Sequence, residues 1–147
     1  MSELDDLYQE VILEHSKHPR NFHSMPAANR QAEGYNPLCG DHYTIFLDVA
    51  DGAIRDISFQ GSGCAISKAS ASMMSQALKS KTTAQAEELF QKFHDVVTDA
   101  TGGDANQLGK LAVFSGVASF PTRIKCATLA WHTLRAALDG KQVASTE

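Results

Sequence analysis

Residues 41–63 read DHYTIFLDVADGAIRDISFQGSG, and this stretch decides the fold. At its centre lies Asp51-Gly52, a dipeptide typical of tight two-residue hairpin turns. Apolar side chains recur at every second position on both sides of that turn: Tyr43, Ile45, Leu47 and Val49 before it, and Ile57 and Phe59 after it. Ile54 falls out of this alternation, so we expect a bulge or an irregular start in the second strand. The stretch therefore predicts an antiparallel hairpin.

Helical periodicity surrounds the hairpin on both sides. Before it, apolar residues spaced as on one helix face occupy positions 4–12, and Pro19 follows their expected end. Residues 20–37 show little periodicity and predict a long connection holding one short strand near 33–36. After the hairpin we expect a helix that begins near Cys64, a second that starts with a capping box at Thr82 and Gln85, and a third between Pro121 and Gly140. A weaker helical pattern covers positions 108–112.

Strands that come first, with helices after them, predict an α+β fold. We expect a small antiparallel β-sheet with helices packed on one face. The length of 147 residues matches one ordinary domain, so residues 1–147 are expected to form a single unit.

The charge balance and the N-terminus exclude several function classes. Thirteen Lys and Arg against seventeen Asp and Glu give a net charge of −4, unlike the basic surface of a nucleic-acid-binding protein. The first six residues, MSELDD, are acidic where a secretory or mitochondrial leader is basic. No apolar run is long enough to span a bilayer. We therefore expect a cytoplasmic protein with neither nucleic acid nor a membrane as partner.

Three cysteines, far apart in sequence, carry the chemistry that the residues predict. Cys39 and Asp41 are two positions apart, so in an extended segment their side chains face the same spot, and Gly40 between them permits a positive φ. Cys64 opens a helix, where free N–H groups and the helix dipole favour a thiolate. Cys126 follows two cationic residues at the start of the last helix.

Three thiolates and one carboxylate make the four ligands of a tetrahedral zinc site, and thiolates also suit iron–sulfur clusters. No CxxC pair forces these residues together, so the spacing alone leaves open three ordinary buried cysteines. The residues Gly61-Ser62-Gly63 are more typical of a capping turn than of a phosphate site. His42 is expected on the opposite face of its strand from Asp41, and the helical histidines His15, His94 and His132 are expected to be structural.

Three blocks of sequence resemble the U-type iron–sulfur cluster assembly family, the NifU N-terminal or IscU-like proteins. The blocks are LCGD at 38–41, GSGCAIS at 61–67 and RIKCATLAW at 123–131, and the opening segment LYQEVILEH at 7–15 is similar as well. They occur in the family's order and cover nearly the whole chain. The resemblance implies that Cys39, Asp41, Cys64 and Cys126 share one site.

The family has a scaffold branch and a zinc branch, and the chain resembles the zinc branch, of SufU type. Lys125 precedes Cys126 where the scaffold branch has a His, and FPTRIK at 120–125 replaces the Pro-Pro-Val-Lys chaperone-docking motif. Residues 108–120 look like an insertion typical of the zinc branch. These departures argue against an Hsp70-type chaperone partner.

The resemblance implies zinc held by Cys39, Asp41, Cys64 and Cys126. It implies that Cys39 accepts persulfide sulfur from a SufS-type cysteine desulfurase, that Arg123 assists near the site, and that other iron–sulfur assembly proteins act downstream. Such a protein would be an acceptor and activator of the desulfurase rather than a stand-alone enzyme. Two alternatives remain: the same ligands could hold iron or a 2Fe–2S cluster that is built and passed on, or zinc could stabilise an interaction module without sulfur chemistry.

Overall fold

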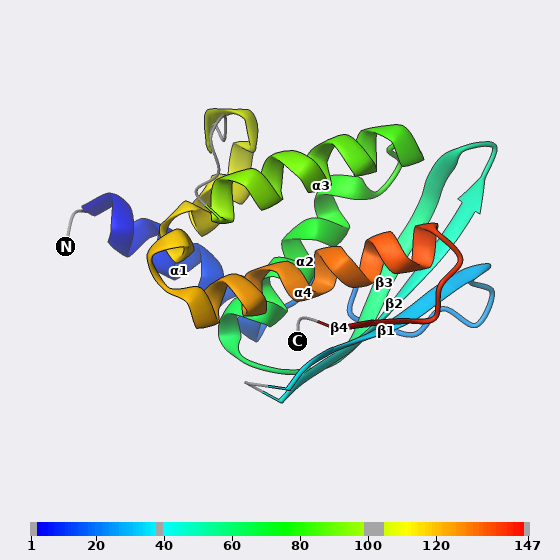
Figure 1. Ribbon diagram of the computed structural model, residues 1–147, viewed down its shortest axis with the longest axis horizontal. Helices are drawn as coiled ribbons and strands as arrows, with labels where there is room; N and C mark the ends of the chain where they lie inside the picture. The colour runs from blue at the N-terminus through cyan, green and yellow to red at the C-terminus, as the bar shows by residue number, and fades with distance from the viewer. Residues whose placement is uncertain (1–2, 38–39, 99–104, 146–147) are drawn as a thin grey trace.

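A computed structural model describes residues 3–37, 40–98 and 105–145 of the chain. Its helices and strands follow one another along the sequence as α1 Glu3–Lys17, β1 Arg30–Asn36, β2 Asp41–Ala50, β3 Ala53–Ser62, α2 Ala65–Leu78, α3 Thr83–Val97, the 3-10 helices η1 Ala105–Gln107 and η2 Gly109–Ser119, α4 Pro121–Leu138 and β4 Val143–Ser145 (Figure 1).

The four strands form one sheet in the order β3-β2-β1-β4. The pairs β1–β2 and β2–β3 are antiparallel, as expected. The short β4 lies parallel to β1, with Val143 opposite Glu33, so the sheet is mixed rather than purely antiparallel. The helices lie on one side of this sheet, which confirms the α+β class and the single helical face (Figure 1).

The β2–β3 hairpin has the turn that its sequence predicts. Asp51 and Gly52 both have positive φ values, 54° and 74°, as a type I′ hairpin turn requires. The register shifts between Asp48 and Val49, and beyond the shift Val49 pairs with Ile54. The irregularity predicted from the out-of-phase Ile54 is therefore confirmed. Because of the register shift, Ile54 points into the core as Ile57 and Phe59 do.

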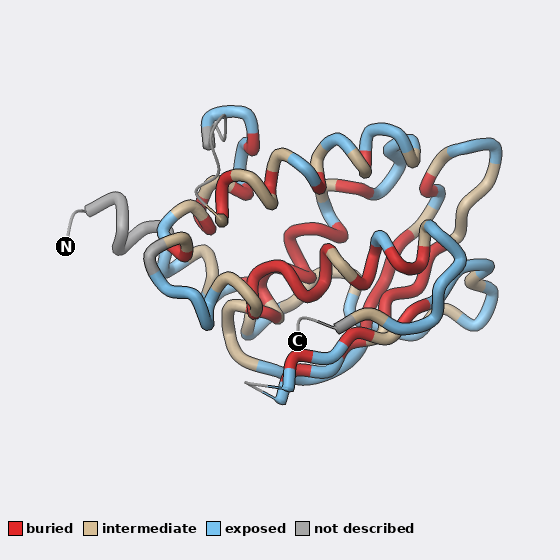
Figure 2. Tube along the Cα trace, viewed as in Figure 1, coloured by how far each residue is buried: buried red, intermediate tan, exposed pale blue. Residues whose placement is uncertain are grey.

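The core lies between the sheet and helices α2 and α4 (Figure 2). Buried side chains at alternate positions of β2, namely Tyr43, Ile45 and Leu47, face these helices. Gly34 of β1 allows α4 to approach closely, because a Cβ at this position would collide with the Thr133 side chain. Trp131 of α4 stacks on Phe93 of α3 at 4.5 Å between ring centroids, which joins α3 to the same core.

Helix α1 and the segment after it are fastened to α2 by polar contacts. The buried His15 Nδ1 lies 2.7 Å from Ser72 Oγ, and the backbone N–H of Arg20 donates to the same oxygen at 2.9 Å. Phe22 then forms a parallel bridge with Phe59 along the outer edge of β3. His15 is structural, as the sequence predicted, because its ring nitrogen is used within the core.

The remaining sequence expectations mostly hold. The short strand expected near 33–36 is the longer β1, the capping box at Thr82 and Gln85 is present at the start of α3, and the weak helical pattern at 108–112 belongs to η2. The Gly102-Gly103 pair, which in sequence predicts a break after the helix that starts at Thr82, lies outside the described residues.

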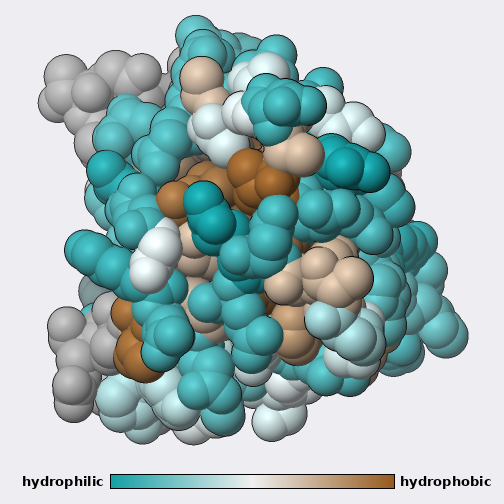
Figure 3. Space-filling model, turned by 90° about the vertical axis from the view of Figure 1, so that its right-hand side faces the viewer, coloured by the Kyte–Doolittle hydropathy of each residue, from teal (hydrophilic) through white to brown (hydrophobic). Residues whose placement is uncertain are grey.

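Among the described helices, none combines the length and apolar character needed to cross a lipid bilayer. The end of the molecule seen in Figure 3 is mainly hydrophilic, with small apolar patches.

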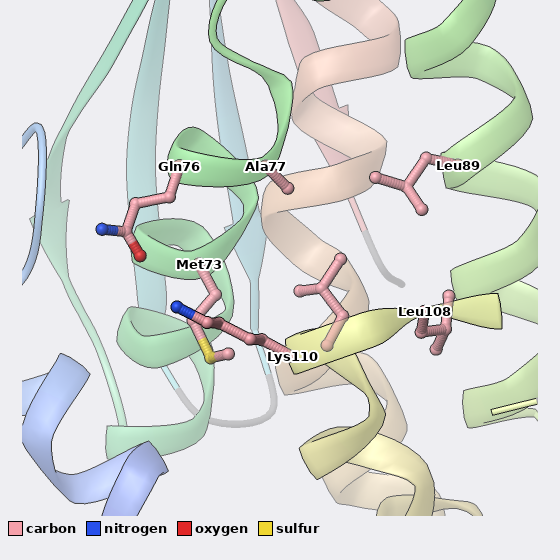
Figure 4. Close-up of a pocket in the computed structure, with 7 residues that line it drawn as sticks. Met73, Gln76, Ala77, Leu89, Leu108 and Lys110 are labelled. Atoms are coloured by element: carbon pink, nitrogen blue, oxygen red, sulfur yellow. The ribbon is translucent and has the colours of Figure 1, made fainter. Parts of the chain in front are cut away.

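A cavity of about 350 Å³ lies between α2, α3 and η2 (Figure 4). Its lining residues are Met73, Gln76, Ala77, Leu89, Leu108, Lys110 and Leu111. Met73 is nine positions from Cys64, about 13 Å along α2 at the usual rise per residue. The cavity is therefore separate from the site described next.

Candidate metal centre

Three of the four residues expected to share a site do converge. One ligand atom each from Asp41, Cys64 and Cys126 lies within 4.8 Å of the others. They come from the first residue of β2, the residue before α2 and the second turn of α4, which gather at one end of the sheet (Figure 1). Asp41 and Cys126 are buried, with exposed fractions of 2% and 4%, and Cys64 is half-buried.

Asp41 points toward the helices because it is in phase with the buried residues of β2. Its two carboxylate oxygens have different partners. Oδ1 accepts the backbone N–H of Cys64 at 2.8 Å, and Oδ2 accepts an N–H of the Asn36 side chain at 3.1 Å. These two bonds hold the carboxylate against the start of α2 and the end of β1.

Cys64 is the N-cap of α2, and its sulfur accepts the backbone N–H of Ser67 at 3.4 Å. A hydrogen bond with Cys126 and the bonds from Ser67 lower the pKa of Cys64 to about 6, against the opposing effects of burial and of Asp41. The Cys64 sulfur is therefore largely a thiolate near neutral pH, the form that binds metals. The sequence predicted a thiolate at this helix start, and local hydrogen bonds are what lower the pKa of Cys64.

Gly63 is required by the crowding around these donors. A Cβ at Gly63 would collide with Asp41 Oδ1, and it would lie 2.6 Å from Ser67 Oγ and 2.7 Å from the Tyr43 hydroxyl. Tyr43 and Ser67 are themselves joined by a hydrogen bond of 3.0 Å. Burial raises the pKa of Tyr43 well above its usual range, so the hydroxyl stays protonated.

Asn36, Tyr43 and Ser67 were not singled out from the sequence. Asn36 donates to Asp41 and also to Cys126 Sγ at 3.7 Å, and Tyr43 and Ser67 line the Cys64 side of the site. The strand phase could have revealed Asn36, because it shares the inward face of β1 with Ala32 and is the last residue before the turn.

The other sequence candidates lie around this cluster or outside it. Cys39 falls outside the described residues, whereas Gly40 beside it has the positive φ that was expected, 71°. The guanidinium carbon of Arg123 lies 4.4 Å from the centre of the Phe120 ring. His42 is exposed on the opposite sheet face, stacked on Tyr35 at 4.3 Å, as predicted.

Arg123 and Phe120 also line a hollow of about 710 Å³. Its walls come from α1, the start of α2, η2 and the start of α4, and include the partly exposed Leu13. Ala65, the neighbour of Cys64, lies in the same wall. The hollow therefore extends to the start of α2, whose N-cap is Cys64.

The donors fit a metal that prefers sulfur. Two sulfurs and one carboxylate oxygen are a partial zinc set, and Zn²⁺ sites in proteins have three or four such ligands. Asn36 Oδ1 lies beside these donors, buried, with no hydrogen-bond partner among the described residues. Asp41, Cys64 and Cys126 could therefore hold zinc, or iron with the same ligands.

Comparison with known proteins gives the family. The model of the NifU-like N terminal domain matches residues 7–139. The zinc-dependent sulfurtransferase SufU of Bacillus subtilis (strain 168) is 40% identical over 131 residues, which cover 89% of this chain and 88% of the relative. The iron–sulfur cluster assembly scaffold protein IscU of Streptococcus pyogenes serotype M1 is 38% identical over 138 residues, covering 94% and 86%.

A solved structure agrees with these relatives. The crystal structure of FiSufU from Fervidobacterium islandicum AW-1, a candidate cluster assembly scaffold for the SUF system, superposes with a TM-score of 0.83. It is 34% identical, and the match covers 88% of this chain and 94% of that one. The chain therefore belongs to the NifU-like N-terminal domain family of iron–sulfur cluster assembly proteins.

Proposed function

We propose that the chain is a SufU-type sulfur acceptor, which takes persulfide sulfur from a SufS-type cysteine desulfurase onto Cys39 and stimulates that enzyme. The observation that carries the proposal is the convergence of Asp41, Cys64 and Cys126 within 4.8 Å, because Asp41 is only two positions in sequence from Cys39. The similarity to a protein named as a zinc-dependent sulfurtransferase supports the same reading.

In this proposal Cys39 is the fourth ligand beside Asp41, Cys64 and Cys126. Zinc, when bound, would keep its cysteine ligands deprotonated and shielded from other electrophiles. Three of the ligands are fixed by the fold: Asp41 by two hydrogen bonds, Cys64 by its capping of α2, and Cys126 by burial in α4. In sequence, Cys39 lies between the end of β1 at Asn36 and the start of β2 at Asp41.

The transfer step is a thiol–persulfide exchange without net oxidation. The Cys39 thiolate attacks the terminal sulfur of the cysteine persulfide on the desulfurase, and a new S–S bond forms on Cys39. The donor's S–S bond breaks, and its electron pair leaves with the desulfurase cysteine as a thiolate. The terminal sulfur keeps its proton, so Cys39 ends as a persulfide ready for the next acceptor.

A single-turnover assay tests this assignment. The desulfurase is loaded with ³⁵S-labelled cysteine and mixed with the wild-type chain, Cys39→Ala or the control His42→Ala, whose exposed side chain lies on the opposite face. We expect label on the wild type and on His42→Ala, and a loss of the fast phase in Cys39→Ala. Labelling of Cys39→Ala at the wild-type rate would show that another residue is the acceptor.

The second candidate is a scaffold that builds a 2Fe–2S cluster as its cargo. The favouring observation is the comparably close relative named as an IscU scaffold, together with a donor set that equally suits iron. Anaerobic reconstitution of zinc-free protein separates the two candidates. A visible absorption spectrum and rapid transfer of the cluster to an apo-ferredoxin would favour the scaffold, and failure of transfer would favour the sulfur acceptor.

A further inference from the structure

Asn36 is a buried polar residue in a place where the fold itself calls for an apolar one. It is the last residue of β1, only 1% exposed, on the inward face that Ala32 and Gly34 share. Its backbone oxygen accepts the N–H of Gly40 at 2.9 Å, so the turn is closed without the side chain. The Asn36 side chain is therefore not needed for the turn.

The amide of Asn36 is directed at two metal donors. Nδ2 lies 3.1 Å from Asp41 Oδ2 and 3.7 Å from Cys126 Sγ. A carboxylate and a thiolate both accept hydrogen bonds, so the group facing them is the NH₂ and not the amide oxygen. Both N–H groups of that NH₂ are thereby used, one with the Asp41 oxygen and one with the Cys126 sulfur.

The amide oxygen of Asn36 is energetically unfavourable. Oδ1 is buried and has no hydrogen-bond partner among residues 3–37, 40–98 and 105–145. A buried acceptor without a partner destabilises a fold, and a leucine of similar shape would avoid the penalty. The two N–H bonds to Asp41 and Cys126 are the gain that accompanies this cost.

We propose that Asn36 is a positioning residue of the metal centre, which holds the Asp41 carboxylate and the Cys126 sulfur at their binding separation. The inference rests on the proposed metal centre and adds a residue to it. Asp41 is fixed between Asn36 and the N–H of Cys64, so one amide connects the positions of all three described donors. When zinc is bound and Cys126 is a thiolate, the two N–H groups of Asn36 would also offset the repulsion between that sulfur and the Asp41 carboxylate.

Two variants test the role, Asn36→Leu and the smaller Asn36→Ser, each of which removes the amide. We expect both to bind zinc roughly 10–100-fold more weakly in competition with a chromophoric chelator, the usual effect of removing a residue that orients a ligand. In cobalt-loaded protein we expect the sulfur-to-cobalt charge-transfer band to shift, because an N–H···S bond withdraws electron density from the sulfur. The control Asn29→Ser loses the side-chain bonds to Val49, far along β2 from Asp41, and should retain wild-type affinity and spectrum.

Urea unfolding of the metal-free proteins separates positioning from simple structural support. Positioning predicts that both variants lose less free energy of unfolding without metal than they lose in zinc binding, because the bonds to Asp41 and Cys126 matter most for the metal-bound arrangement. A folded Asn36→Ser with wild-type zinc affinity and an unchanged cobalt spectrum would overturn the proposal, and so would an apo-stability loss in both variants that fully accounts for the weaker binding. Sulfur labelling at Cys39 is scored separately, so a wild type that binds zinc but accepts no sulfur refutes the proposed function alone.

Discussion

Replacing Gly63 with alanine adds one methyl group between three polar atoms of the metal centre. The new Cβ would lie 2.6 Å from Ser67 Oγ and 2.7 Å from the Tyr43 hydroxyl, where ordinary contact begins at 3.4 Å. Each neighbour must retreat by about 0.7–0.8 Å, which is overpacking of a buried site. The φ of Gly63 is not in the left-handed region, so the effect of Gly63→Ala is steric and local.

The expected cost follows from the burial of these neighbours. Tyr43 is fully buried and its hydroxyl is bonded to Ser67, so neither group can move without disturbing the Cys64 environment. Overpacking of this kind costs about 1–3 kcal/mol. A loss near 2 kcal/mol lowers the melting temperature of a chain this size by roughly 4–8 °C. Because the methyl group also collides with Asp41 Oδ1, zinc affinity should fall by roughly 10–100-fold, the usual effect of disturbing the orientation of a metal ligand.

The loss of stability is measured by circular dichroism during urea and thermal unfolding, with zinc and with a chelator. The loss of zinc affinity is measured by chelator competition. Gly116→Ala is the matched control, because a Cβ there has no neighbour within 4 Å. It should leave stability within about 1 kcal/mol of the wild type and zinc binding unchanged. If Gly63→Ala unfolds at the same urea concentration as Gly116→Ala and holds zinc as tightly, the crowding described at this site is wrong.

Three further outcomes are expected. Chelation of bound zinc should lower the melting temperature, because its ligands join β2, α2 and α4; a curve unchanged after verified zinc removal would contradict the shared site. Burial, with Arg20 as a smaller cause, lowers the pKa of His15, so the folded chain binds fewer protons than the unfolded one and loses stability as pH falls from about 7 to about 5. In metal-free protein His15→Asn should flatten that slope, and an unaltered slope would show that His15 does not contribute. Trp131→Phe removes the indole N–H bond to Ser70 Oγ at 3.1 Å and should cost about 1–3 kcal/mol in urea unfolding followed by circular dichroism; wild-type stability would refute this.

The hairpin was predictable because strand periodicity and turn chemistry are local properties. The alternation of apolar residues around Asp51-Gly52 can be recognised without tertiary information. The position of Ile54, out of phase with this alternation, was enough to predict the register shift. The three-residue β4 was missed because Val143–Ser145 is too short to show a period and pairs with a strand more than a hundred residues earlier. The mixed character of the sheet follows from that one long-range pairing.

The metal-binding residues of the site could be predicted from the sequence, but the residues and contacts that position them could not. Asp41, Cys64 and Cys126 carry side chains that bind metals, and a family resemblance joined them where spacing could not. Asn36 has no such chemistry of its own, and its role appears only when the register places it opposite Asp41. The lowered pKa of Cys64 likewise depends on contacts with Ser67 and Cys126, which only the folded chain brings together.

The bridge at Phe22 and the short strand β4 have a consequence for self-association. Along β3, the Phe59 N–H is taken by the backbone of Asn21, and on the other side Glu33 to Tyr35 of β1 are paired with β4. Exposed strand edges invite pairing with a second chain and aggregation, and short covering segments prevent it. Removing residues 143–147 would uncover hydrogen-bonding groups of β1 and should make the protein aggregate more readily through this newly exposed strand edge.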